Sequence, residues 1–274
     1  MSRSDYVFGA TEAEHDRLAR QAGVLAPFTE RFFLDAGVAR GQHVLDIGCG
    51  VGDVSMLVAG LVGPNGRVTG IDQDEGALAT ARKRAAAGGF AQITFVPGDV
   101  TKFKGASNFD AAVGRLILQF LPDPGEVIHH LASLVRVGGI VAFQEPSWTS
   151  LIAQTAHLPL RSACARLVHR AIERAGARTN MELLLFQEFR RAGLSPIVFR
   201  LDTPIGDSPN QRRWLHDLFL NVLPRLKTNG EPLEQLGDLA SLGQRLDAEL
   251  IEHNSYATCL AVVGAAARVP SPGH

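Results

Sequence analysis

The chain contains few cysteines, no long hydrophobic run and no excess of charge of one sign. Its three cysteines, Cys49, Cys164 and Cys259, are far apart and form no CxxC pair, which argues against a disulfide framework and a zinc site. Apolar runs stay well short of the ~20 residues that a membrane-spanning helix needs. The 27 Lys and Arg residues balance 28 Asp and Glu residues, so the sequence predicts neither a nucleic acid nor a membrane partner.

The N-terminal segment also lacks the apolar core of a signal peptide, because residues 2–20 are mostly polar and charged. With the scattered cysteines, this predicts a cytoplasmic protein. A length of 274 residues and a hydrophobic content of 46% suit one large α/β domain or a domain with a sizeable cap.

Short apolar runs alternate with helical patterns along the first half of the chain. The expected strands are 43–47, 67–72, 92–96, 109–113, 140–143, 196–201 and 256–266. The expected helices are 52–62, 75–87 and 124–135, with mostly helical stretches at 11–35, 150–193 and 208–252. Pro27 is expected to divide the first stretch into two helices, and Gly138-Gly139 to form a turn. Strands alternating with helices predict a parallel sheet with helices on both faces.

The most informative segment is Val44–Asp53, an apolar run that breaks into glycines at every second position, Gly48, Gly50 and Gly52. It predicts a buried strand followed by a tight loop whose backbone comes close to a ligand. A loop of this kind that opens a helix binds nucleotide-like cofactors. The dinucleotide fingerprint G-x-G-x-x-G is not matched, because Asp53 stands where its third glycine would be.

Charged residues stand at the ends of four expected strands, where ligands bind in open α/β sheets. Asp46 can hold the loop or reach an ammonium group, and Asp72 can accept both hydroxyls of a ribose. Asp99 suits the exocyclic amine of adenine, and Arg115 can pair with a carboxylate. Together these groups fit S-adenosylmethionine (SAM) better than a pyrophosphate. Structural roles stay open as alternatives. Asp72 and Asp99 can instead cap a helix or form a turn, and Arg115 can instead form a structural ion pair.

The order of these motifs resembles that of the class I SAM-dependent methyltransferases, in particular the small-molecule branch with the ubiquinone/menaquinone-biosynthesis-type enzymes. The motifs that carry the resemblance are Asp46–Gly52, Gly70-Ile71-Asp72, Gly98-Asp99-Val100, Phe109-Asp110-Ala111 and Val135–Gly139. The resemblance is strong over residues 40–146 and extends, less specifically, to Tyr6–Gly9 and the helix at 14–21.

The resemblance implies a Rossmann-like α/β fold, a seven-stranded methyltransferase sheet whose last strand is antiparallel, with helices on both faces and a helical cap. Within a single domain 1–274, the SAM-binding core is expected at about 36–148, 194–206 and 254–268, and the cap at about 1–35, 149–193 and 207–253. The expected cofactor-binding residues are Tyr6, Asp46, Gly48, Gly50, Gly52, Asp72, Gln73, Asp99, Val100, Gly114 and Arg115. By resemblance, Gly48 and Gly114 hold the methionine amino group through backbone carbonyls. Gln73 departs from the apolar residue that the family often packs on the adenine ring.

Glu145 stands at the end of the fifth expected strand, where a carboxylate can orient or deprotonate an acceptor. It can equally be a loop acid that bonds to backbone amides. His216 is a further candidate for catalysis. The residues expected to line an acceptor pocket are aromatic: Phe120, Trp148, Phe186 and Trp214. Apolar stripes in 209–223 and 236–250 are expected to form cap or dimer core, which leaves a homodimer open.

Motifs of other methyltransferase branches are absent. Gly114-Arg115-Leu116-Ile117 stands where enzymes that methylate amide or base nitrogens have Asn/Asp-Pro-Pro-aromatic. A Pro-Cys pair for cytosine methylation and the acid–acid–Asn pattern of metal-dependent catechol-type enzymes are missing too. The chain is therefore expected to methylate O, C or N of a small, largely apolar or aromatic acceptor without a metal, in secondary metabolism or quinone-like chemistry. The alternatives are a SAM-binding protein that does not methylate and an NAD-dependent oxidoreductase.

Overall fold

The computed structural model describes residues 12–103 and 108–271, with side chains from Arg17 onward, so the expected cofactor residue Tyr6 lies outside the described residues. The strands are β1 (His43–Ile47), β2 (Arg67–Asp72), β3 (Ile93–Pro97), β4 (Phe109–Arg115), β5 (Val135–Ser147), β6 (Pro196–Asp202), β7 (Ile205–Gly206), β8 (Ala257–Thr258) and β9 (Ala261–Arg268). The α-helices are α1 (Glu12–Ala36), α2 (Asp53–Val62), α3 (Glu75–Ala87), α4 (Pro124–Leu134), α5 (Trp148–Thr155), α6 (Pro159–Arg174), α7 (Met181–Arg191), α8 (Pro209–Thr228) and α9 (Leu242–Glu252). Two short 3₁₀ helices are η1 (Leu118–Phe120) and η2 (Leu233–Leu236).

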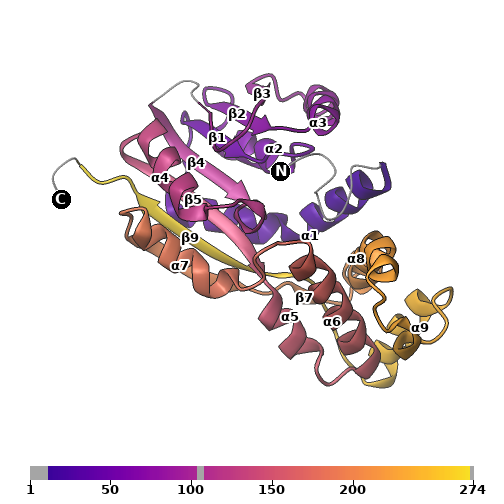
Figure 1. The fold of residues 1–274 in the computed structure, drawn as a ribbon. Coiled ribbons are helices and arrows are strands. Elements are labelled where there is room, and N and C mark those ends of the chain that lie inside the picture. The colour runs from indigo at the N-terminus through magenta and orange to yellow at the C-terminus, as the bar shows by residue number, and fades with distance from the viewer. Residues whose placement is uncertain (1–11, 104–107, 272–274) are drawn as a thin grey trace. The chain divides into compact units, whose positions relative to one another are not determined.

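Within the described residues the main sheet has seven strands in the order β3-β2-β1-β4-β5-β9-β6 (Figure 1). The pairs from β3 to β5 are parallel. Val269, just beyond β9, exchanges backbone hydrogen bonds with Gly138 and Gly139 near the start of β5, so β9 runs against β5. This order and the antiparallel strand confirm the expected α/β sheet. Because Ile47 pairs with both Ile71 and Gly114, the carboxyl ends of β1, β2 and β4 lie side by side.

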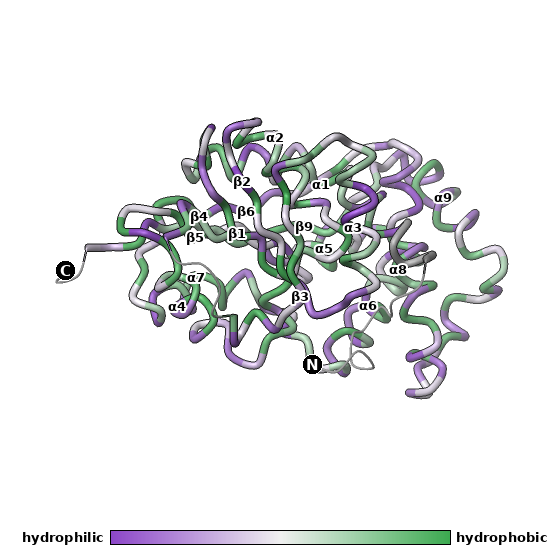
Figure 2. Tube along the Cα trace, turned by 90° about the horizontal axis from the view of Figure 1, so that it is seen from above, coloured by the Kyte–Doolittle hydropathy of each residue, from purple (hydrophilic) through white to green (hydrophobic). Residues whose placement is uncertain are grey.

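Helices cover both faces of the sheet, because alternate strand residues enter two different cores. Leu45 and Ile47 pack in the core that includes α4 and α7, whereas Val44 packs with residues of α1 and α2. Strand β9 is apolar along nearly its whole length, as its green colour in Figure 2 shows, and its residues Ala261–Ala267 are buried. A strand with no polar alternation suits an interior position of the sheet.

The chain divides into two compact units. Of the described residues, the core unit contains 25–103, 108–145, 181–201 and 263–271 and holds most of the main sheet. The cap unit contains the described residues 12–24, 146–180 and 202–262. Residues 25–35 and α7, which the sequence suggested as cap, group with the core unit. The reason is packing: Phe32 and Phe33 of α1 are buried with Val44, and Phe189 of α7 stacks edge-on against Phe143 of β5.

Three local expectations are corrected. Pro27 lies inside one continuous α1, because a proline removes only one helical hydrogen bond and the buried Phe32 and Phe33 hold the following turns in place. Gly138-Gly139 is a bulge rather than a break, so β5 begins at Val135 and its register with β4 shifts there. The expected last strand 256–266 is divided into β8, which pairs with β7, and β9. No helix of the described segments is both long and apolar enough to cross a membrane.

Candidate active site

The glycine loop between β1 and α2 has a left-handed backbone at each of its three glycines. The φ angles are +63° at Gly48, +53° at Gly50 and +87° at Gly52. Only glycine adopts this conformation without strain, which explains why glycine recurs at every second position. The loop therefore folds as the sequence predicts.

The three glycines differ in what surrounds them. A Cβ on Gly48 would lie 2.6 Å from Cγ1 of Ile117, and a Cβ on Gly52 would lie 3.1 Å from both Ala81 and Phe95. A Cβ on Gly50 would meet none of the described atoms within 4 Å. Gly48 and Gly52 thus allow the protein to pack closely, whereas Gly50 borders open space that a ligand can fill.

Asp72 ties the glycine loop to the end of β2. One carboxylate oxygen accepts the N–H of Gly50 at 2.8 Å, and the other accepts the N–H of Asp74 at 2.9 Å. Each oxygen keeps a second lone pair, so the carboxylate can still accept ribose hydroxyls. Burial raises its pKa, while these hydrogen bonds favour the ionised form.

Asp46 is buried under the same loop. Its Oδ2 accepts a hydrogen bond from the Ser55 hydroxyl at 2.6 Å, and Oδ1 has no partner in the described part of the chain. Burial raises the pKa of Asp46 to about 7, against the opposing effects of Ser55 and the charge of Arg115. An orphaned buried carboxylate oxygen at a strand end suits a cationic ligand group, such as the ammonium of SAM.

Arg84 of α3 fastens the loop from outside. Its guanidinium donates to the Val51 carbonyl at 2.7 Å and pairs with Asp53 at 2.6 Å. Sequence reasoning missed this residue, because one arginine on an Ala-rich helix carries no distinguishing signal. The ion pair with Arg84 also gives Asp53 a structural role, because it stabilises the glycine loop.

Glu145 holds the segment that follows β4. Its fully buried carboxylate accepts the backbone N–H groups of Ile117 at 3.0 Å, Leu118 at 2.8 Å and Gln119 at 3.1 Å. Burial raises its pKa to about 7, against the effect of these three hydrogen bonds. Through this contact Glu145 positions Ile117, whose side chain packs on Gly48.

The other expected cofactor residues also lie at strand ends of the core unit. Arg115 donates to the Thr29 hydroxyl at 3.0 Å, and burial lowers its pKa. Asp99 accepts from the N–H and the hydroxyl of Thr101, which lowers its pKa and makes an exposed turn. Val100 is buried in the core, whereas Gln73 is exposed. Asp99 and Gln73 can therefore contact adenine only as exposed side chains at the protein surface.

Three of the remaining candidates lie in the cap unit. Trp148 is buried, and its indole N–H has no partner among the described residues. The indole N–H of Trp214 is already donated to Gln21, at 2.9 Å. The His216 ring lies against Gly243 of α9, and burial lowers its pKa.

Phe120 and Phe186 lie in the core unit. Phe120 ends η1, in the segment that Glu145 holds. Phe186 of α7 is 43% exposed and packs edge-on against Phe199 of β6, with ring centroids 5.3 Å apart. The structure therefore brings Phe120, but not Phe186, together with the strand-end residues of the core unit.

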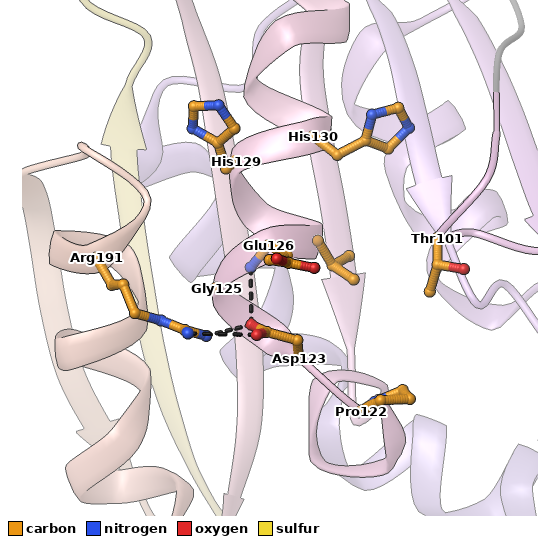
Figure 3. A pocket seen from close by; sticks show the side chains of 9 residues that line it. Thr101, Pro122, Asp123, Gly125, Glu126, His129, His130 and Arg191 are labelled. Atoms are coloured by element: carbon orange, nitrogen blue, oxygen red, sulfur yellow. Dashed lines mark hydrogen bonds and ion pairs between the residues drawn. The ribbon is translucent and has the colours of Figure 1, made fainter.

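A hollow of about 600 Å³ lies beside α4 and α7 (Figure 3). Arg191 pairs with Asp123 there. The rings of His129 and His130 lie within hydrogen-bond distance of the backbone carbonyls of Ala192 and Phe103, respectively. None of the strand-end residues lines this hollow, and the described residues contain no group of three metal-ligating side chains.

Comparisons with known proteins agree with this geometry. Residues 39–183, more than half of the chain, match the family model described as a methyltransferase domain. Aklanonic acid methyltransferase DauC of Streptomyces sp. (strain C5) is 33% identical over 140 residues, which are 51% of this chain and 63% of that protein. Demethylmenaquinone methyltransferase of Staphylococcus aureus is 31% identical over 123 residues, 44% of this chain and 50% of that protein.

A solved structure of a putative methyltransferase from Bacillus halodurans C-125 has the same fold, with a TM-score of 0.61 and 15% identity over 89% of this chain and 99% of that one. The matches to the two curated relatives span between half and two thirds of those proteins' own lengths. Since the family model covers the strands and loops that carry the glycine loop, Asp72 and Glu145, the chain belongs to the SAM-dependent methyltransferase family.

Proposed function

We propose that this chain transfers the methyl group of SAM to a small organic acceptor. The observation that carries the proposal is the glycine loop tied to Asp72, with open space at Gly50. Two relatives, named for aklanonic acid and demethylmenaquinone, support an acceptor that is a small organic molecule. Bound SAM supplies a methyl group on a sulfonium, so the residues of the chain chiefly bind, orient and exclude water.

Each strand end has a role in this proposal. Asp72 holds the ribose hydroxyls, and Asp46 holds the ammonium together with the backbone at Gly48 and Gly114. Arg115 pairs with the cofactor carboxylate, because the hydrogen bond that its guanidinium makes within the described residues goes to a neutral group, the Thr29 hydroxyl. Asp99 and Val100 border the adenine. Phe120, Trp148 and Trp214 remain the aromatic candidates for the acceptor, in secondary metabolism or quinone-like chemistry.

Calorimetric binding and methyl transfer test this function together. SAM is expected to bind and NAD(H) not to bind. Labelled SAM is then incubated with phenols, indoles and prenylated acids, and label is expected in at least one acceptor. Binding without transfer to any compound would favour a non-methylating SAM protein. Binding of NAD(H) alone would overturn the cofactor assignment.

Asp72→Ala is expected to weaken SAM binding by about 1.5–3 kcal/mol, the range for a hydrogen bond to a charged group. The matched control is Asp74→Ala, because Asp74 caps α3 through the N–H groups of Gly76 and Ala77. The control loses about 1 kcal/mol of stability and keeps its affinity for SAM. If both variants bind SAM as the wild type does, Asp72 does not hold the ribose.

The affinity for SAM is expected to rise with pH through Asp46, whose pKa is about 7. A cation binds the ionised carboxylate, so binding releases a proton, and affinity rises about fivefold from pH 6 to pH 7. Titration calorimetry in buffers of different ionisation enthalpy measures both quantities. Asp46→Asn is expected to abolish the proton release and the pH dependence. If the variant keeps both, a group other than Asp46 is responsible for them.

A further inference from the structure

The cap unit contains a buried arginine, Arg161, that forms no ion pair with a described residue and leaves two of its guanidinium donors without a hydrogen bond there. Arg161 lies in the first turn of α6 and is 0% exposed, which makes it one of the largest fully buried side chains of the described chain. Helices α6, α8 and α9 pack together around this region (Figure 1). Arginine is almost never fully buried unless it is paired.

Few of the guanidinium donors are used. Nη1 lies 3.5 Å from the carbonyl of Arg212, a long contact, and both Nε and Nη2 are buried with no partner among the described residues. Nε and Nη2 form one edge of the planar guanidinium, with two parallel N–H groups. This is the edge that a carboxylate engages with both of its oxygens.

The acidic side chains near this cation form no hydrogen bond with its guanidinium in the described residues. Glu249 of α9 directs its two oxygens to the backbone N–H groups of Leu160 and Arg161, at 2.6 and 2.9 Å. Burial raises the pKa of the Cys164 and Cys259 thiols to about 12, so both are neutral at pH 7. Burial likewise lowers the pKa of Arg161 itself.

An unpaired buried charge costs several kcal/mol or more, so its partner is expected to come from outside the chain. A singly charged carboxylate balances one guanidinium. The negative charges of Asp247 and Glu249 also act on Arg161, which disfavours a phosphate dianion more than a singly charged carboxylate. The nearby Arg212 of α8 already forms an ion pair, because its guanidinium lies 2.6 Å from the carboxylate of Asp207.

We propose that the Nε/Nη2 edge of Arg161 binds a carboxylate group of the acceptor, so that the substrate class is a largely apolar organic acid. This inference rests on the proposed methyl transfer. The remainder of the cap agrees with an apolar acceptor body, because Leu158, Leu250 and Ala257 form a buried apolar cluster there.

The experiment compares aryl carboxylates with their neutral amides. Benzoate, 2-naphthoate and anthraquinone-2-carboxylate, each with its amide, are titrated calorimetrically into the full chain saturated with S-adenosylhomocysteine. The wild type is expected to bind at least one acid about 10- to 100-fold more tightly than its amide, the range for a charged hydrogen bond. Arg161→Met is expected to lose that preference. Arg161→Lys is expected to keep only part of it, because a lysine ammonium cannot donate two parallel N–H bonds to a carboxylate.

The matched control is Arg170→Met on the same helix, because Arg170 pairs with Glu231 at 3.0 Å. It is expected to keep the preference for the acid. The melting temperature of Arg161→Met is expected to stay level or rise, since the variant removes an unpaired buried charge, whereas a structural arginine would lower it. A wild type that binds none of the acids, or binds acid and amide alike, overturns the proposal, as does an Arg161→Met variant that keeps the preference. Failure of methyl transfer with the preference intact would instead contradict the proposed function alone.

Discussion

Replacing Gly50 with alanine is expected to weaken SAM binding about 10- to 100-fold while the protein stays folded, because an extra methyl group forced into a closely packed contact costs about 1–3 kcal/mol. The added Cβ meets none of the described atoms within 4 Å, so it enters the space that we assign to the cofactor. The φ of +53° makes the substitution cost about 1–2 kcal/mol of stability. Calorimetry with SAM and thermal unfolding measure the two effects separately.

Two other glycines provide the comparison. Gly41, before β1, has a φ of +82° and equally open surroundings among the described residues, so Gly41→Ala carries the same strain without touching the loop. It is expected to bind SAM as the wild type does. Gly48→Ala should lose both binding and stability, because its Cβ overlaps Ile117. If Gly50→Ala and Gly41→Ala bind SAM equally well, the cofactor does not lie against the loop at Gly50.

Replacing Glu145 with glutamine is expected to lower both stability and the affinity for SAM. The carboxylate accepts three backbone N–H groups, and a glutamine amide turns an NH₂ group toward one of them. Losing a hydrogen bond to a charged group costs about 1.5–3 kcal/mol, which for a chain of this length corresponds to a fall in melting temperature of roughly 3–5 °C. The affinity falls because the segment that holds Ile117 against Gly48 loosens.

The turnover number of the Glu145→Gln variant distinguishes a positioning role of Glu145 from a role as general base. If Glu145 positions the segment after β4, kcat at saturating SAM falls less than about tenfold, whereas loss of a general base costs about 10²–10⁴-fold. Glu249→Gln is the matched control, because Glu249 also accepts two backbone N–H groups, in the cap unit. The control should lose stability and keep its affinity for SAM. A Glu145→Gln variant with unchanged affinity and melting temperature contradicts the positioning role.

The sequence predicted the strands and loops of the cofactor half well, because their signals are local. β1, β2 and α3 have the expected bounds, since apolar runs and flanking glycines mark where each begins and ends. The errors at Pro27 and Gly138-Gly139 have one cause. Both residue types usually end an element, but burial of Phe32 and Phe33 and the pairing of Phe109 with Val135 kept these elements continuous.

The candidate site was predictable where backbone conformation dictates the residue, as in the left-handed glycines. It was not predictable where partners are distant in sequence. Arg84 bonds to Asp53 across 31 positions, and Glu145 bonds to Ile117 across 28. For Glu145 the sequence left catalysis and backbone bonding open, and only the fold reveals three N–H donors around one carboxylate.

The sequence by itself determined the fold class, the family and the methyl donor, because the glycine spacing and the strand-end acids are short-range patterns that few backbones accept. Only the tertiary structure decided which glycine borders open space and which acid holds the segment after β4. It also decided that two donors of the buried Arg161 have no partner among the described residues. Burial and partnership depend on contacts between segments far apart along the chain. No local pattern encodes them, and they set the free energy of each polar group.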